Sequence, residues 1–194
     1  QLESDGMRDL VRRLVPANFS DIIALLAMYR PGPLGTGMVD THVECKHGRK
    51  RVVYDHEILE PILKETYGVI LYQEQVMKVV QEMAGYSLGQ ADILRRAIGK
   101  KKVEEMSRQK IHFLEGARAR GVPDHIADKV FNDIAFFAQY GFNKSHSAAY
   151  AVLTYRTAWL KAHYRVEYMA SLLTSEIRNN ENVVYYLGVT KEMG

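Results

Sequence analysis

The chain has 194 residues, of which 47% are hydrophobic and 25% are charged, and its formal net charge is +3. These proportions are ordinary for a globular protein with one or two domains and a sizeable core. No apolar run is long enough to span a bilayer and no signal-peptide pattern opens the chain, so no membrane partner is expected. The single cysteine, Cys45, excludes an internal disulfide and a cysteine-based zinc site and suits a reducing cytosol. The seven histidines have no metal-ligand spacing, so no metal site is predicted.

The first third of the chain predicts two helices followed by irregular structure. Apolar residues of the first helix recur at Met7, Leu10, Val11 and Leu14. Ser20 is the predicted cap of a second helix, which runs to about Tyr29 and ends at a proline-rich turn. Residues 34–61 lack periodicity, and we expect an irregular segment there with a short strand at 52–54.

The remainder of the chain predicts a series of helices and no further sheet. They are expected from about residue 72 to Gly85, from Ser87 or Gln90 to Gly99, over 103–121, after Pro123, over 145–163, around 169–177 and over 181–192. The helix over 145–163 is apolar almost all round, so we expect other helices to enclose it. The predicted fold class is mainly α, with at most short β segments.

Positive charge is concentrated at residues 95–102, where five of eight positions are Lys or Arg. Adjacent arginines on a helix point about 100° apart, so Arg95 and Arg96 cannot both face the interior. Arginine forks bind phosphate oxygens bidentately, which favours a phosphate ligand for this pair. The lysines after Gly99 are equally well explained as a charge complement to the helix dipole.

A glycine turn followed by a helix start occupies residues 140–150, Tyr-Gly-Phe-Asn-Lys-Ser-His-Ser-Ala-Ala-Tyr. Ser145 is the predicted N-cap, and the free N–H groups of the first turn together with Lys144 and His146 predict an anion site. An ordinary capped helix with solvated Lys and His side chains is the alternative interpretation.

Four motifs occur in order along the chain: residues 29–34 (Tyr-Arg-Pro-Gly-Pro-Leu), 66–75 (Thr-Tyr-Gly-Val-Ile-Leu-Tyr-Gln-Glu-Gln), 95–101 (Arg-Arg-Ala-Ile-Gly-Lys-Lys) and 140–150. Together they resemble the C family of bacterial replicative DNA polymerases, the polymerase III alpha subunits, over essentially the whole chain. The resemblance implies a cytoplasmic bacterial protein. It places a fingers domain at 1–164 and the start of the following helical, little-finger region at 165–194. Both ends of the chain are expected to continue into a longer protein.

In this family the palm, expected outside this chain together with the thumb and the C-terminal regions, holds two Mg²⁺ ions, and the fingers bind the incoming dNTP. By resemblance, the nucleotide-phosphate ligands are Arg95, Arg96, Lys100, Lys101, Lys144, His146 and Tyr150. The implied partners are dNTP, primer-template DNA and, through regions elsewhere, other replisome subunits. No Asp-x-Asp occurs and Glu74 lacks a second carboxylate at matching spacing, so the chain alone is expected not to polymerise DNA.

Three further features carry predictions of their own. The basic run offers a possible DNA-backbone contact through Lys46, Arg49, Lys50 and Arg51, with a solvated loop as the alternative. Arg30 precedes prolines that predict a rigid turn near the base of the fingers or, equally well, a plain helix stop, and Arg30 itself has no evident role. Arg165 stands where the family usually has proline, which puts the local turn in question.

Two other functions compete with the polymerase interpretation. A non-catalytic helical module would use the same cations on nucleic-acid phosphates, with affinity that falls steeply with salt. A purely structural helical domain would leave the paired arginines and the Lys-Ser-His turn without a purpose. The four motifs in register favour the polymerase.

Overall fold

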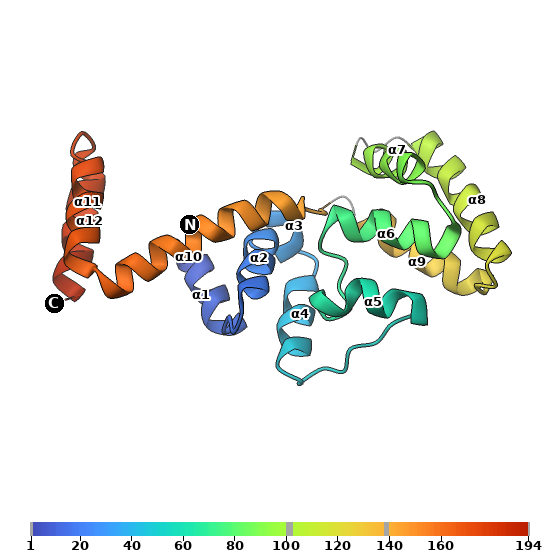
Figure 1. Ribbon diagram of the computed structural model, residues 1–194, viewed down its shortest axis with the longest axis horizontal. Coiled ribbons are helices and arrows are strands. Elements are labelled where there is room, and N and C mark those ends of the chain that lie inside the picture. The colour runs from blue at the N-terminus through green and yellow to red at the C-terminus, as the bar shows by residue number, and fades with distance from the viewer. Residues whose placement is uncertain (1, 100–102, 138–139, 194) are drawn as a thin grey trace. The chain divides into compact units, whose positions relative to one another are not determined.

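The computed structural model describes residues 2–99, 103–137 and 140–193, and these residues form helices and turns without a strand. The prediction of a mainly α fold is confirmed. The chain separates into two compact units, residues 1–151 and 152–194, and Figure 1 shows the helices of each. The division falls within α10 (Lys144–His163). The family-based boundary at residue 164 divides the chain on a different criterion and stays a prediction.

The first unit begins with α1 (Asp5–Leu14), α2 (Phe19–Met28), α3 (Pro31–Leu34) and α4 (Met38–Lys46). Asn18 caps α2, so the prediction of Ser20 as its cap was wrong. The Asn18 Oδ1 accepts the Asp21 N–H at 3.0 Å, and the Asp21 carboxylate accepts the Asn18 N–H at 3.3 Å. This reciprocal pair of bonds is available only when Asp21 is the third residue of the helix, and it fixes the helix start.

Helix α4 lies where the sequence predicted irregular structure. Its buried face includes His42, whose polar side chain interrupts the apolar stripe formed by Met38, Val39, Val43 and Cys45. The His42 Nδ1 lies 3.2 Å from the Thr66 carbonyl oxygen, and burial lowers the pKa of His42 to about 4. The strand predicted at 52–54 was also wrong, because no described segment pairs with these residues.

Helices α6 (Gln73–Ala84), α7 (Leu88–Gly99), α8 (Val103–Ala119) and α9 (Asp124–Phe137) pack together, as Figure 1 shows. They are preceded by η1 (Glu57–Leu59), α5 (Glu60–Leu63) and η2 (Lys64–Thr66). The predicted ends hold here: Gly85 terminates α6 at φ +73°, and Ser87 and Gln90 exchange side-chain-to-N–H bonds at the start of α7. Helix α8 crosses α6 so closely that a Cβ on Gly116 would lie 2.1 Å from the Ala84 carbonyl oxygen.

Two apolar cores fill this unit, and the extended segment before α6 contributes to both. One core is formed by the helices from α5 through α9 and contains Val76, Met83, Leu94, Phe113 and Ile134. The other joins α1, α2 and α4 around Leu10, Leu14, Leu25, Met28 and Val43. Ile70 packs in the first core, whereas Val69, Leu71 and Tyr72 pack in the second. Side chains of this segment thus pack in both cores, and they fix the start of α6.

The second unit contains α11 (Arg165–Ser175) and α12 (Asn180–Met193), which pack against each other (Figure 1). Among the described residues of this unit, only Thr154 and Met169 are buried. The prediction that helices enclose the apolar residues of 145–163 was wrong, since Leu153 exposes 53% and Trp159 42% of its surface. The unit has too few helices to cover every face.

The break between α10 and α11 is present although Arg165 stands in place of the family's proline. Tyr164 has a non-helical backbone with φ −129° and ψ 58°, and Arg165 is the first residue of α11. The first helical position does not require a backbone donor, so a proline there and an arginine are both compatible with the break. The Arg165 Nη1 donates to the Met193 carbonyl oxygen, which ties α11 to the end of α12.

Candidate anion-binding site at the start of α6

The start of α6 is joined directly to the glycine turn at 140–143. The Gln73 N–H donates to the Phe142 carbonyl oxygen at 3.0 Å, and the Phe142 N–H donates to the Leu71 carbonyl oxygen at 3.1 Å. These two bonds form an isolated parallel bridge between Tyr72 and Phe142. Two of the four motifs, separated by about 70 residues of chain, therefore lie side by side.

Buried Gln75 fixes the segment that leads into α6. Its Oε1 accepts the N–H groups of Leu71 and Tyr72, both at 2.9 Å. Its Nε2 donates to the Thr66 Oγ1 at 2.8 Å and to the Ile62 carbonyl oxygen at 3.3 Å. Every hydrogen-bonding atom of this side-chain amide is thus used, which holds η2 and the α6 start in one arrangement.

Gln73 connects the two basic clusters that the sequence singled out. Its Oε1 accepts a hydrogen bond from the Arg95 Nη1 at 3.3 Å, and its Nε2 donates to the Gly141 carbonyl oxygen at 3.2 Å. One side chain therefore touches both α7 and the glycine turn. The structure brings Arg95 and the turn that carries Lys144 to the same end of α6.

Arg95 and Arg96 share one carboxylate on their own helix. Arg95 donates from Nε and Nη2 to the Asp92 Oδ1 at 2.9 and 2.7 Å, and the Arg96 Nη2 lies 2.6 Å from the Asp92 Oδ2. The hydrogen bonds from Arg95 hold the pKa of Asp92 below its usual range, and the charge of Arg96 acts in the same direction. Arg96 remains 66% exposed, whereas Arg95 is half-buried, so the two arginines do not both face the interior, as expected.

Lys144 is contacted by two carboxylates. Its Nζ lies 2.6 and 2.8 Å from the two carboxylate oxygens of Glu65, and its backbone N–H donates to both oxygens of Glu74 at 3.1 Å. The ammonium also lies 5.3 Å from the centroid of the buried Tyr72 ring, within the range of a cation–π contact. Burial raises the pKa of the Tyr72 hydroxyl well above its usual value, so this ring stays uncharged.

The start of α10 differs from its predicted form. Asn143 is the cap in place of Ser145, because its Oδ1 accepts the His146 N–H at 2.8 Å. The Lys144 N–H already has the Glu74 carboxylate as acceptor. The prediction of an anion site built on free N–H groups of this turn was therefore wrong for these two amides. The positive charge of the Lys144 side chain remains as the anion-attracting group.

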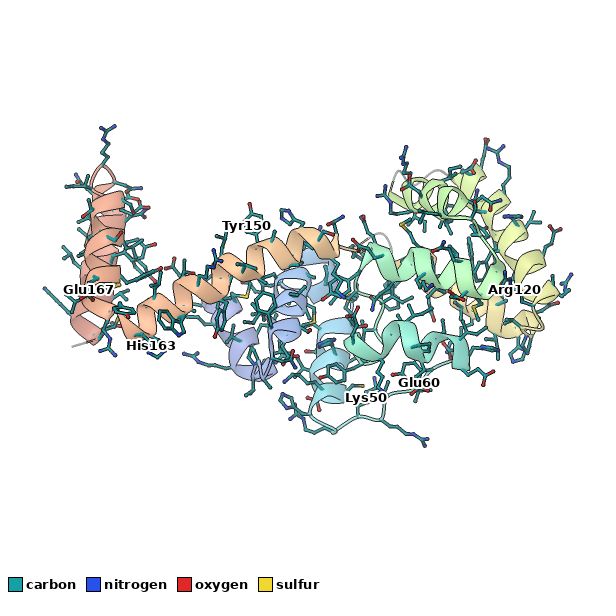
Figure 2. All side chains as sticks on the ribbon, viewed as in Figure 1. Lys50, Glu60, Arg120, Tyr150, His163 and Glu167 are labelled. Carbon is teal, nitrogen blue, oxygen red and sulfur yellow. The ribbon has the colours of Figure 1, made fainter. Side chains whose placement is uncertain are left out.

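His146 and Tyr150 contact aromatic rings, whereas Lys144 contacts carboxylates. The His146 ring lies 5.3 Å from Phe142 and 4.6 Å from Tyr150, measured between ring centroids. Figure 2 shows Tyr150 on the outer side of α10, with 42% of its surface exposed. The contacts do not bring these two rings to Arg95. The predicted ligands Lys100 and Lys101 lie outside the described residues.

Most of the basic side chains at 46–51 have partners within the fold, which a fully solvated loop would not have. Lys46 ends α4 with its ammonium 3.3 Å from the buried Asp21 carboxylate and 2.9 Å from the Val15 carbonyl oxygen. Arg49 donates two hydrogen bonds to Glu44, and Lys50 donates to the Thr41 Oγ1 (Figure 2 labels Lys50). Arg51 is exposed. A DNA-backbone contact by this run stays a prediction, and Lys46 contributes least because its charge is used internally.

Arg30 has a role that sequence reasoning missed. Its Nη1 donates to the Tyr140 carbonyl oxygen at 3.3 Å, and its guanidinium lies 4.7 Å from the centroid of the Phe142 ring. A Cβ on Gly32 would lie 2.2 Å from the Tyr140 ring, so this ring packs directly on the glycine. The Arg-Pro-Gly-Pro motif thus packs against the glycine turn that comes directly before Lys144.

No three His, Cys, Asp or Glu side chains among the described residues are grouped as metal ligands. These residues do not fit a magnesium pair, and no catalytic step through a metal is assigned to them. Within the part of the chain that the structure describes, no helix has both the length and the apolar character of a membrane span.

Comparison with known proteins agrees with the four motifs. A sequence model of the bacterial DNA polymerase III alpha subunit finger domain matches residues 1–121. The chain belongs to this family. DNA polymerase III subunit alpha of Escherichia coli (strain K12) is 53% identical over 199 residues, covering all of this chain and 17% of that protein. The Haemophilus influenzae subunit is 55% identical over 95% of the chain and 16% of its own length, and the Vibrio cholerae subunit is 54% identical over all of the chain and 17% of its length.

The site in this finger domain contains partners that the sequence alone did not indicate. Three cations, Arg95, Arg96 and Lys144, face three carboxylates, which belong to Asp92, Glu65 and Glu74. Asp92 was detectable as a helical neighbour three and four residues before the arginines. Glu65 and Glu74 lie 79 and 70 residues from Lys144, and no local pattern connects them.

Proposed function

We propose that this chain is the fingers part of a replicative DNA-directed DNA polymerase and that Arg95, Arg96 and Lys144 contact the triphosphate of the incoming dNTP. The observation that carries the proposal is the Gln73 side chain, which bonds to Arg95 and to the Gly141 carbonyl oxygen and so holds two cationic segments at one helix end. Family membership supports the same assignment. Lys100, Lys101, His146 and Tyr150 complete the proposed set.

Cationic side chains at this position act on phosphate charge. A dNTP carries several negative charges, and more charge moves onto the leaving pyrophosphate as the new bond forms. Exposed Arg96 offers a fork for two phosphate oxygens, and Lys144 offers a point charge. Their contribution is to bind and orient the nucleotide and to stabilise the charge that develops during transfer.

The remaining parts of the reaction belong to the longer polymerase. The chain spans 17% of the length of the E. coli relative it matches. The palm would hold two Mg²⁺ ions, primer-template DNA would contact several domains, and replisome subunits would bind elsewhere. We expect the chain alone not to polymerise DNA and the full polymerase to act in the bacterial cytoplasm.

The test uses the full-length polymerase that carries this segment, with Arg96→Ala and Lys144→Ala. Losing one charge-assisted contact is expected to lower kcat/KM for dNTP by about 10- to 100-fold, through both KM and kcat. The dissociation constant of primer-template DNA should stay nearly unchanged. Arg118→Ala is the matched control, since it removes the same charge from α8, where the guanidinium pairs only with Asp124 among the residues described. Weakened DNA binding with an unchanged nucleotide response would contradict the assignment and favour a backbone-binding module.

A further inference from the structure

The Lys144 ammonium has an anionic partner within the fold. Both carboxylate oxygens of Glu65 lie within 2.8 Å of its Nζ. A phosphate group would bind an ammonium in a similar way, through two of its oxygens. Glu65 takes two of the three N–H donors of the ammonium, so a phosphate group that binds it through more than one oxygen has to displace at least one of these contacts.

Glu65 is carried by a rigid part of the fold. It belongs to η2, and the next residue, Thr66, is buried. The Thr66 hydroxyl lies 3.2 Å from the Leu63 carbonyl oxygen and 2.6 Å from that of Val69, and it accepts a hydrogen bond from Gln75. The backbone around Glu65 is therefore fixed within reach of Lys144.

The ion pair itself is readily exchanged. The Lys144 side chain is 38% exposed and the Glu65 side chain 40%, so water screens their attraction. A triphosphate carries more charge than one carboxylate and attracts the ammonium more strongly. Release from Glu65 also requires no movement of the α10 backbone, since Glu74 holds the Lys144 N–H independently.

We propose that Glu65 competes with the nucleotide triphosphate for the Lys144 ammonium and thereby sets the nucleotide affinity of the site. The inference rests on the proposed function, because it takes Lys144 as a triphosphate ligand. It assigns Glu65 as an affinity-setting residue that acts through Lys144 and does not touch the reacting atoms.

The first experiment compares steady-state kinetics of the full-length polymerase with its Glu65→Gln variant. Removing the competing charge is expected to lower KM for dNTP by about two- to fivefold, the range that corresponds to a partly exposed ion pair, with little change in kcat. Glu57→Gln is the matched control: it removes the same charge from an exposed position nearby that makes no ion pair among the described residues, and KM should not change. An unchanged or raised KM in Glu65→Gln would overturn the inference.

A double-mutant cycle separates the inference from the proposed function. In a Lys144→Ala background, Glu65→Gln should no longer alter KM, because the residue through which Glu65 acts is gone. A KM decrease that persists in this background would show that Glu65 acts by another route and would overturn the inference. If Lys144→Ala alone leaves the nucleotide response intact, the proposed function fails at this residue. If Lys144→Ala raises KM while Glu65→Gln has no effect, only the competition by Glu65 is disproved.

Discussion

Residues 1–151 and 152–194 are built from similarly apolar helices, yet they bury very different numbers of side chains. The first unit contains two cores in which Leu14, Val76, Phe113 and Ile134 have no exposed surface. In the second unit Val166, Ile177 and Val184 each expose at least 70%. The difference follows from the number of neighbours, since α6 packs against α7 and α8, whereas α11 packs mainly against α12. Apolar composition predicts which residues gain from burial, but the available helices decide which residues are buried.

The largest expected loss of stability in either unit comes from Phe113→Ala in α8. The Phe113 ring is fully buried, and its centroid lies 5.4 Å from that of Phe131. Losing it should lower the free energy of unfolding of the first unit by about 3–5 kcal/mol. Denaturant unfolding followed by far-UV circular dichroism measures the loss. A change below about 1 kcal/mol would show that this core is much looser than the contacts indicate.

An intermediate effect is expected from pH through His42 in α4. Burial lowers the pKa of His42 from 6.5 to about 4, so the unfolded chain takes up this proton before the folded chain does. The contribution of His42 is fully present above pH 6.5 and is lost as pH falls from 6.5 to 4, by about 3 kcal/mol at most.

Unfolding curves at a series of pH values, compared between the unchanged chain and His42→Gln, test this prediction. The variant should lose much less stability between pH 6.5 and 4, although its stability at neutral pH also changes because the bond to Thr66 is altered. Equal slopes in the two proteins would mean that His42 is not the group responsible.

The smallest effect is expected in the second unit, from Val184→Ala in α12. Its side chain is 70% exposed, so the change in unfolding free energy should stay within about 0.5 kcal/mol. The only tryptophan of the chain, Trp159, lies in this unit and reports on it separately. Tryptophan fluorescence should give a lower unfolding midpoint than circular dichroism, which follows all helices. Coincident midpoints would show that the two units unfold as one, against the comparison.

Sequence periodicity located most helices because their apolar faces are regular. The helices around Val76 and Phe113 were predicted with their glycine ends, since Gly85 and Gly121 have the positive φ that a helix end favours. Helix α4 was missed because His42 occupies a buried position, and a histidine is not counted in an apolar stripe. The caps Asn18 and Asn143 were each misplaced by two residues, since a serine two positions later is an equally good cap by type.

The cationic half of the candidate site was predictable and its anionic half was not. Arg95, Arg96 and Lys144 stand in local motifs, so composition and family resemblance both pointed to them. Their partners on other helices, Gln73, Glu65 and Glu74, come from distant segments that only the folded chain brings near. A contact of this kind is set by tertiary packing, which a one-dimensional pattern does not contain.

The bridging position of Gln73 bears on the thermodynamics of ligand capture. Because one amide group bonds to both Arg95 and the Gly141 carbonyl oxygen, the two cationic segments are held together before any anion arrives. The loss of conformational entropy needed to assemble them therefore occurs during folding and is not repeated at each turnover. In the proposed polymerase cycle, the nucleotide would therefore meet two cationic segments that the fold has already placed on one side chain.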